Sequence, residues 1–175
     1  MKNILETKRL LLREFQVKDA QKIYELNTDL EVIKYTGDAA FESIQHAKIF
    51  LKNYTDYKKN GYGRWAVVLK KSSEFIGWCG LKLNEENFTD IGFRFFKGVW
   101  NNGFATESSN AVLAYGFDKL DLTEIIGRSA IENSASINIL KKLNMTFWKV
   151  DTCEGIENSV YYRINKKQYN DKQRQ

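Results

Sequence analysis

Proline is absent from this chain of 175 residues, histidine occurs once and cysteine twice. Cys79 and Cys153 stand in no CxxC or other metal-ligand spacing and indicate no disulfide framework. A single histidine, His46, cannot build a metal site of several histidines. The sequence therefore predicts no metal centre, and its cysteine usage agrees with a reducing compartment such as the cytoplasm.

The chain also lacks a long apolar run near its start. In the opening segment MKNILETKRLLLREF, no more than three apolar residues follow one another. A secretory signal needs a longer apolar core, and a membrane span needs about 20 apolar residues. We therefore expect a cytoplasmic protein with no membrane partner.

The glycine motifs of common nucleotide-binding folds are missing as well. No Gly-Lys-Ser or Gly-Lys-Thr occurs, which excludes a P-loop, and no GxGxxG follows an early strand. Neither a P-loop nucleotidase nor a dinucleotide-dependent oxidoreductase is expected.

The positive charge is modest and unevenly placed. The net charge is +5, and the last ten residues, KKQYNDKQRQ, hold four basic residues and one acid, which leaves little charge on the body. A solvated, frayed terminus explains this better than a nucleic-acid surface, so no nucleic-acid partner is expected. With 43% hydrophobic and 28% charged residues, we expect one globular domain over 1–165 and a basic C-terminal tail over 166–175.

Hydrophobic periodicity predicts alternating groups of strands and helices. Helices are expected after Asp19, over 43–59, after Gly103 and over 133–143. Strands are expected over 9–15, 65–71, 74–83, 90–96, 124–131, 146–151 and 159–165. This order is typical of an α+β (mixed α/β) fold.

The segment VWNNGFATESSN, residues 99–110, places a lone glycine at a helix entrance. Gly103 can adopt backbone angles closed to other residues and lets a ligand approach the main chain. The first amides of a helix have no partner within it and favour an anion. This pattern indicates an anion site; the alternative is an ordinary turn between loop and helix.

The motifs in this order resemble the GNAT acetyltransferases, in particular the RimJ/RimL type that acts on ribosomal-protein N-termini. Trp100, Gly103 and Ala105 fit the family's pyrophosphate loop, [QR]xxGx[GA], in the version that begins with tryptophan. NSASINILKKL, from Asn133 to Leu143, resembles its N-x-x-S…K-L-G-F helix, and LETKRLLLREF and IGFRF resemble further segments. The resemblance covers about Leu5 to Ile164.

This resemblance implies a central, mostly antiparallel twisted sheet, flanked by helices and splayed between the strands at 90–96 and 124–131. It implies acetyl-CoA as cosubstrate. The loop amides would bind its pyrophosphate; they belong to Asn101, Asn102, Gly103, Phe104, Ala105 and Thr106. The backbone of Phe93, Arg94 and Phe95 would lie beside the pantetheine arm and thioester. Asn133 would hydrogen-bond to the arm, act as a plain helix N-cap, or do both.

The catalytic groups are less clear from the motifs. Many family members protonate the leaving thiolate with a tyrosine seven residues after the helix asparagine, and here that residue is Leu140. Ser136 is the nearest candidate for this bond; the alternative is a serine bonded to its own helix. Asp90 stands where some members carry a base; the alternative is a solvated acid at a strand end. Glu107, in the first helical turn, is interpreted as structural.

The resemblance implies acetyl transfer to a primary amine, by direct attack in a ternary complex because no acylatable nucleophile stands out. An α-amine with a pKa near 8 is neutral more often at pH 7 than a lysine amine, so a site without a strong base favours a protein N-terminus. A polyamine or aminoglycoside is the alternative, and a non-catalytic acyl-CoA-binding module is a further one. Monomer and homodimer stay open. The acceptor wall is expected to include Tyr24, Tyr35, Phe41, Tyr54 and Tyr57, with Glu25, Asp29, Glu31 and Glu42.

Overall fold

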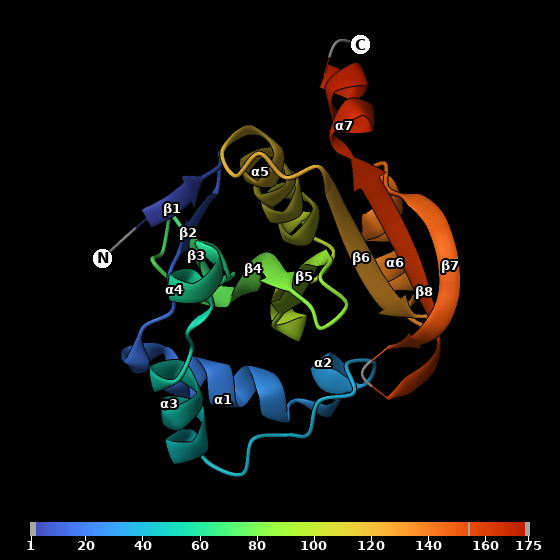
Figure 1. Cartoon of the computed structure of the whole chain (residues 1–175). Helices are drawn as coiled ribbons and strands as arrows, with labels where there is room; N and C mark the ends of the chain where they lie inside the picture. The colour runs from blue at the N-terminus through green and yellow to red at the C-terminus, as the bar shows by residue number, and fades with distance from the viewer. Residues whose placement is uncertain (1–2, 154, 174–175) are drawn as a thin grey trace.

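The computed structural model describes residues 3–153 and 155–173 (Figure 1). Within these residues, eight strands form one sheet in the order β1-β2-β3-β4-β5-β6-β8-β7. The strands are β1 (Asn3–Glu6), β2 (Leu10–Arg13), β3 (Arg64–Leu69), β4 (Phe75–Leu83), β5 (Thr89–Phe95), β6 (Glu124–Ala130), β7 (Thr146–Cys153) and β8 (Ile156–Asn165). The helices are α1 (Ala20–Thr28), α2 (Leu30–Ile33), α3 (Ile44–Lys52), α4 (Asp56–Asn60), α5 (Phe104–Asp118), α6 (Ser134–Lys142) and α7 (Lys166–Gln173).

Helices cover both faces of the sheet. On one face, Val112, Leu113 and Phe117 of α5 pack into the main core with the buried residues of β2 to β6. On the other face, α1 and α3 form a smaller core around Ile23 and Leu51, against Ala66 of β3 and Phe75 of β4. The sheet is therefore enclosed by apolar layers at its centre, and the fold is α+β as expected.

The sheet opens between β5 and β6. All neighbouring strands are antiparallel except this pair, which runs parallel. The register joins only Asp90 to Ile126 and Ile91 to Gly127, whereas β5 stays paired with β4 as far as Phe95. Beyond Ile91 the register joins no further residues of the two strands, and Figure 1 shows β5 and β6 apart. The expected splay between these strands is confirmed.

The long helix expected over 43–59 is two helices in the structure. The helix α3 ends at Lys52, and α4 begins after Thr55, its N-cap. Asn53 and Thr55 have side chains that compete for backbone hydrogen bonds and so favour helix ends. The sequence pattern also missed the short elements β1 and α2, which hold too few residues to show a period.

The C-terminal segment is not frayed as expected. Residues 166–173 form α7, and Tyr169 is buried and stacked on Phe117 of α5, with 4.8 Å between ring centroids. Its hydroxyl donates to Asp118 Oδ2 at 3.3 Å, and Lys166 pairs with Asp121. The expectation failed because one buried aromatic ring anchors an otherwise polar helix. Residues 174 and 175 of the expected tail lie outside the described residues.

Candidate active site

A cavity of about 390 Å³ passes between the diverging strands and under α1 and α3. Its wall on the α6 side includes Asn133, Ser136 and Leu140. Its floor includes Asp90 and Phe93 of β5. The structure thus brings several of the predicted site residues around one space, although Phe95 and the loop at 101–106 do not line it.

The loop before α5 is shaped by its backbone. Gly103 is the N-cap of α5 with φ +78° and ψ 4°, a left-handed conformation that glycine adopts without strain. The space where a Cβ would stand is open, and its nearest neighbour is Arg9 Nη2 at 3.5 Å. Asn101 is also left-handed, with φ +61°. Asn102 closes the turn by donating from Nδ2 to the carbonyls of Val99 and Trp100.

The first amides of α5 remain available to a ligand. The first intrahelical bond runs from Glu107 N to Gly103 O at 2.9 Å, so the N–H groups of Phe104, Ala105 and Thr106 have no acceptor within the helix. None of the residues from 101 to 106 has a charged side chain. This arrangement can bind an anion through the main chain.

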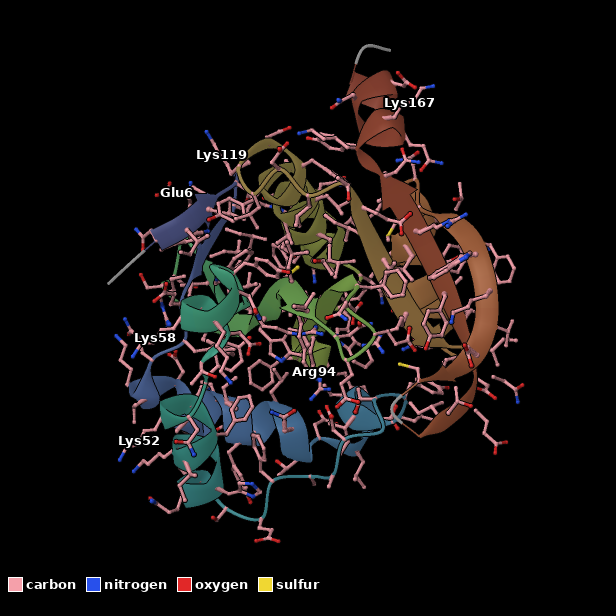
Figure 2. All side chains as sticks on the ribbon, viewed as in Figure 1. Glu6, Lys52, Lys58, Arg94, Lys119 and Lys167 are labelled. Atoms are coloured by element: carbon pink, nitrogen blue, oxygen red, sulfur yellow. The ribbon has the colours of Figure 1, made fainter. Side chains whose placement is uncertain are left out.

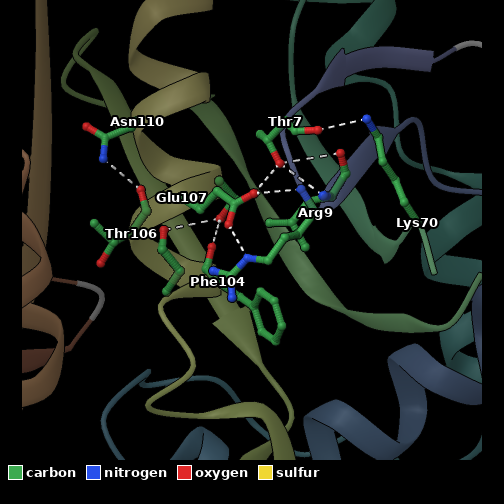
Figure 3. A network of polar contacts seen from close by, with 10 residues as sticks. Thr7, Arg9, Lys70, Phe104, Thr106, Glu107 and Asn110 are labelled. Carbon is green, nitrogen blue, oxygen red and sulfur yellow. Dashed lines mark hydrogen bonds and ion pairs between the residues drawn. The ribbon is translucent and has the colours of Figure 1, made fainter. Parts of the chain in front are cut away.

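Glu107 anchors the start of the chain to α5 (Figure 3). Its Oε1 accepts from Thr7 Oγ1 at 2.5 Å and from Arg9 N at 3.0 Å, and its Oε2 accepts from Arg9 Nε at 2.6 Å. Desolvation opposes ionisation, but the hydrogen bonds from Thr7 and Arg9 outweigh it and lower the pKa of Glu107. The structural interpretation of Glu107 is confirmed. The Arg9 guanidinium also stacks over Phe104, 4.3 Å from the ring centroid.

The backbone of β5 offers hydrogen-bonding groups to the gap. Phe96 N donates to Ile76 O of β4, and hydrogen-bonded pairs alternate along antiparallel strands. The polar groups of Phe93 and Phe95 therefore point away from β4, toward the gap. The Phe95 carbonyl is taken by Trp100 Nε1 at 2.8 Å. Arg94 differs from the expectation, because its backbone groups face Trp78 of β4.

The α6 helix begins at Asn133, whose Oδ1 accepts from Ser136 N at 3.1 Å. Asn133 therefore acts as an N-cap, while its Nδ2 makes no hydrogen bond within the described part of the chain. Ser136 Oγ likewise has no hydrogen bond to its own helix or to any other described residue. Both side chains line the cavity with free polar groups. Leu140 is buried beside them and contributes no proton donor.

Asp90 is not the solvated acid that the sequence left as an alternative. It is 4% exposed, and its Oδ2 accepts from Arg128 Nη2 at 2.8 Å and Nε at 3.2 Å. Arg64 Nη2 lies 3.7 Å from the same oxygen. The alternative that Asp90 is a solvated acid is wrong, because β3 and β6 each place an arginine guanidinium beside its carboxylate.

Arg94 holds the loop that follows α2. Its guanidinium donates to Asn27 of α1 and to Asp38, and lies 5.3 Å from the Trp78 ring centroid. In Figure 2, Arg94 lies inside the molecule, whereas the labelled lysines lie at separate places on its periphery. The labelled lysines are Lys52, Lys58, Lys119 and Lys167.

Sequence reasoning missed the charged side of this cavity. Arg64, Trp78 and Arg128 line it, as do Asp38 and Cys153. The signal was present in the strand DIGFRFF: Asp90, Gly92 and Arg94 alternate with the apolar Ile91, Phe93 and Phe95. Alternation places the first set on one face of the sheet, opposite the core.

The acceptor wall differs in part from the expectation. Tyr35, Phe41 and Tyr54 line the cavity, but Tyr24 and Tyr57 do not. None of the four expected acids lines it. Glu25 instead bonds to Lys22, Asp29 caps α2, and Glu31 lies 3.9 Å from Lys97, while Glu42 is exposed. Glu25 lies outside the face of α1 that buries Ile23 and Leu26.

The surroundings of Cys79 and His46 argue against a catalytic role for either residue. Cys79 is fully buried in the core, and burial raises the pKa of its thiol, which makes it a poor nucleophile. His46 is exposed on α3 against Phe41.

Over residues 3–153 and 155–173, no group of three or more His, Cys, Asp or Glu side chains could hold a metal ion. In the same ranges, no helix combines the length and apolar character that crossing a membrane requires.

The fold and the site define a class of enzyme. A sheet opened at a parallel strand pair leaves backbone groups free for an extended thioester arm, and the adjacent helix start suits the arm's phosphates. This is the architecture of an acyltransferase that uses coenzyme A.

The chain belongs to the GNAT acetyltransferase family, and it is an acetyl-CoA-dependent N-acetyltransferase. The family model described as "Acetyltransferase (GNAT) domain" matches residues 9–146. An uncharacterized N-acetyltransferase of Bacillus subtilis, YnaD, is 34% identical over 173 residues, which cover 95% of this chain and 99% of the relative.

Solved structures share the fold. A GNAT-family acetyltransferase from Bacillus anthracis has a TM-score of 0.77 at 28% identity, covering 93% of this chain and 98% of the other. A spermidine N-acetyltransferase from Vibrio cholerae, solved with CoA and spermine, has a TM-score of 0.77 at 20% identity, covering 93% and 99%. At that identity the second likeness shows the fold alone.

Proposed function

We propose that the acceptor is the α-amine of a peptide or protein N-terminus, as in the RimJ/RimL type that the motifs resemble. The observation that carries this proposal is the charge of the cavity wall. Two of its three acids are already paired with arginines: Asp38 with Arg94, and Asp90 with Arg128. The third, Asp56, helps to raise the pKa of Tyr54, after the larger effect of burial, and is a single carboxylate. A polyamine would need free carboxylates for its several charges, and such a wall suits it poorly.

The acetyl donor would lie along the free backbone groups. We assign its pyrophosphate to the main-chain amides of residues 101–106, where the helix dipole adds about 0.3–1 kcal/mol for an anion. Hydrogen bonds from amides to a charged group are stronger than neutral ones and supply most of the affinity. We assign the pantetheine arm to the polar groups of Phe93 on one side and to Asn133 Nδ2 on the other.

In the proposed reaction, the neutral amine attacks the thioester carbonyl, the C–S bond breaks, and sulfur leaves as a thiolate that takes up a proton. Ser136 Oγ is the candidate hydrogen-bond donor to that sulfur, since it has no other partner among the described residues. The proton lost by the amine goes to Asp90 or to water. Asp90 is our candidate base because it lines the cavity on the acceptor side.

The test is acetyl-CoA turnover, followed by release of free thiol, across short peptides, spermidine and an aminoglycoside. We expect peptides with small, unblocked first residues to react faster than spermidine at equal concentration. The reverse ranking would reassign the acceptor to a small polycation. Acetyl-CoA binding without turnover on any amine would instead indicate a binding module.

A further inference from the structure

We propose that Arg64 recognises a carboxylate on the acceptor, so that the preferred substrate is an amine with a carboxylate a few bonds away. This inference rests on the proposed function and narrows it to a substrate class. A peptide that begins with an acidic residue has this chemistry, because its first side chain carries the carboxylate. Spermidine has no carboxylate.

The backbone of Arg64 is fixed by two tyrosines. Arg64 is the first residue of β3, beyond the point where β2 pairs with that strand. Its N–H donates to Tyr54 Oη at 2.7 Å, and its carbonyl accepts from the Tyr57 hydroxyl. Burial raises the pKa of both phenols well above 10, so both stay protonated and neutral at ordinary pH. These two hydrogen bonds fix the position of the Arg64 backbone, from which the side chain extends.

The guanidinium of Arg64 lies over Gly92, on the face of the sheet that also carries Trp78. In the register, Arg64 lies opposite Gly80, and Gly80 lies opposite Gly92, so the three share one face. A Cβ on Gly92 would overlap the Arg64 guanidinium, which means that only glycine leaves room for it. The Trp78 ring covers the group, with 4.5 Å from Arg64 Cζ to the ring centroid. The Trp78 ring and the space above Gly80 and Gly92 therefore hold the guanidinium N–H groups in one orientation.

Within residues 3–153 and 155–173, the N–H donors of Arg64 make an ion pair but no hydrogen bond. Its charged neighbour is Asp90 Oδ2 at 3.7 Å, beyond hydrogen-bond distance, and that oxygen already accepts from Arg128 at 2.8 Å. Among the described residues, the Arg64 guanidinium donates no hydrogen bond. Yet its side chain is only 17% exposed, and it lines the cavity. A largely desolvated guanidinium with free donors favours a planar anion that accepts two bonds.

The distance to the reaction centre limits the substrate. Arg64 rests on Gly92, and the next residue, Phe93, turns its backbone groups to the gap where we place the thioester. Adjacent Cα atoms are about 3.8 Å apart. An amine that reaches the thioester while its carboxylate reaches Arg64 must therefore carry the two groups close together.

The first experiment compares kcat/KM for two matched peptides, Glu-Ala-Ala and Gln-Ala-Ala, which differ only in the charge of the first side chain. We expect wild type to prefer the acidic peptide by about 10- to 100-fold, the scale of a hydrogen-bonded charge pair. A second pair, Asp-Ala-Ala and Asn-Ala-Ala, tests the same preference with a shorter first side chain. A ratio near one for both pairs would overturn the inference.

Variants of the protein test whether the preference for the acidic peptide depends on Arg64. Arg64→Gln should bring the preferred ratio close to one, and Arg64→Lys should keep only part of it because lysine lacks the planar fork. Gly92→Ala should lower the same ratio by displacing the guanidinium while leaving Arg64 in place. Lys58→Gln, on the exposed face of α4, is the matched control and should keep the wild-type ratio.

The ratio is measured within each variant, so a partial loss of folding does not imitate the effect. A preference that survives in both Arg64→Gln and Gly92→Ala would contradict the assignment to Arg64. Peptides acetylated without any acidic preference would contradict this inference alone. Spermidine acetylated in place of peptides would contradict the proposed function itself.

Discussion

At the scale of single residues, Gly103 has the most specific requirement. Its left-handed backbone favours glycine, and the open space beside it is where an approaching phosphate would lie. A substitution there therefore combines two effects, backbone strain and a blocked approach, and the two can be separated because asparagine tolerates the left-handed conformation.

We expect Gly103→Val to abolish acetyl-CoA binding, and Gly103→Asn to weaken it strongly with less loss of stability. Calorimetric titration gives the affinity, and a thermal melt reports the fold. Asn102→Ala should cost much less affinity, because the anion is proposed to meet main-chain donors. Asn110→Ala, about two turns further along α5, is the control. Wild-type affinity in a folded Gly103→Asn protein would exclude the proposed anion site.

Ser136 is the second residue whose role can be isolated. Ser136→Ala should lower kcat with little change in acetyl-CoA affinity, because only the leaving sulfur would lose a partner. The loss should be about 10²- to 10⁴-fold if the serine is a true general acid, and smaller for a supporting hydrogen bond. The exposed Ser134→Ala is the matched control in the same helix. Unchanged turnover would assign the proton to solvent.

At the scale of elements, the contact between the first hairpin and α5 depends on Glu107. Thr7 and Arg9 belong to the turn between β1 and β2, and both bond to this carboxylate. The link joins residues about 100 positions apart at the base of the helix whose first amides face the proposed phosphate site.

We expect Glu107→Gln to lower the free energy of unfolding by about 1–3 kcal/mol near pH 7, since hydrogen bonds to a charged group are lost. Because the pKa of Glu107 is lowered in the folded state, its ionised form stabilises the fold above the ordinary value of 4.5. That contribution falls as the pH drops below 4.5 and is lost as the pH passes through the lowered pKa.

Urea denaturation of both proteins at several pH values measures this difference. The gap between wild type and variant should be widest near neutrality and should close in acid. Glu124→Gln removes a looser pair, 3.9 Å from Arg163, and should show a smaller gap. A gap that stays constant with pH would mean that the charge of Glu107 does not contribute.

The sequence predicted most elements because their apolar residues form a continuous run, as in β4, or lie on one helix face, as in α5. It failed where one or two contacts decide the outcome. The break between α3 and α4 lies beside Tyr54 and Tyr57, which bond to the backbone of a distant strand. The helix α7 depends on a single stacked tyrosine, Tyr169. Such tertiary contacts leave no periodic signal in the chain.

At the scale of the whole molecule, the two halves of the proposed site could be predicted from the sequence to different extents. The proposed cofactor half depends on backbone conformation, which a local motif such as WNNGFATE encodes. The proposed acceptor half consists of side chains of β3, β4, β5 and β6 that meet only in the folded sheet. Arg64 and Asp90 lie 26 positions apart in the chain, and no local pattern joins them.

The pH dependence of turnover tests the whole reaction, because it reports which amine is used. An α-amine has a pKa of about 7.7–8.0, so its neutral fraction rises about 15- to 25-fold from about pH 6.5 to about pH 8.5. With a peptide acceptor below saturation, kcat/KM should rise by a similar factor and then level off. A lysine-like or polyamine amine, with a pKa near 10, would give a rate that still rises tenfold per pH unit at the upper end.

A peptide blocked at its N-terminus but carrying a lysine is the control, and we expect it to be inert. If its rate equals that of the unblocked peptide, the enzyme acts on side-chain amines and the α-amine assignment is wrong.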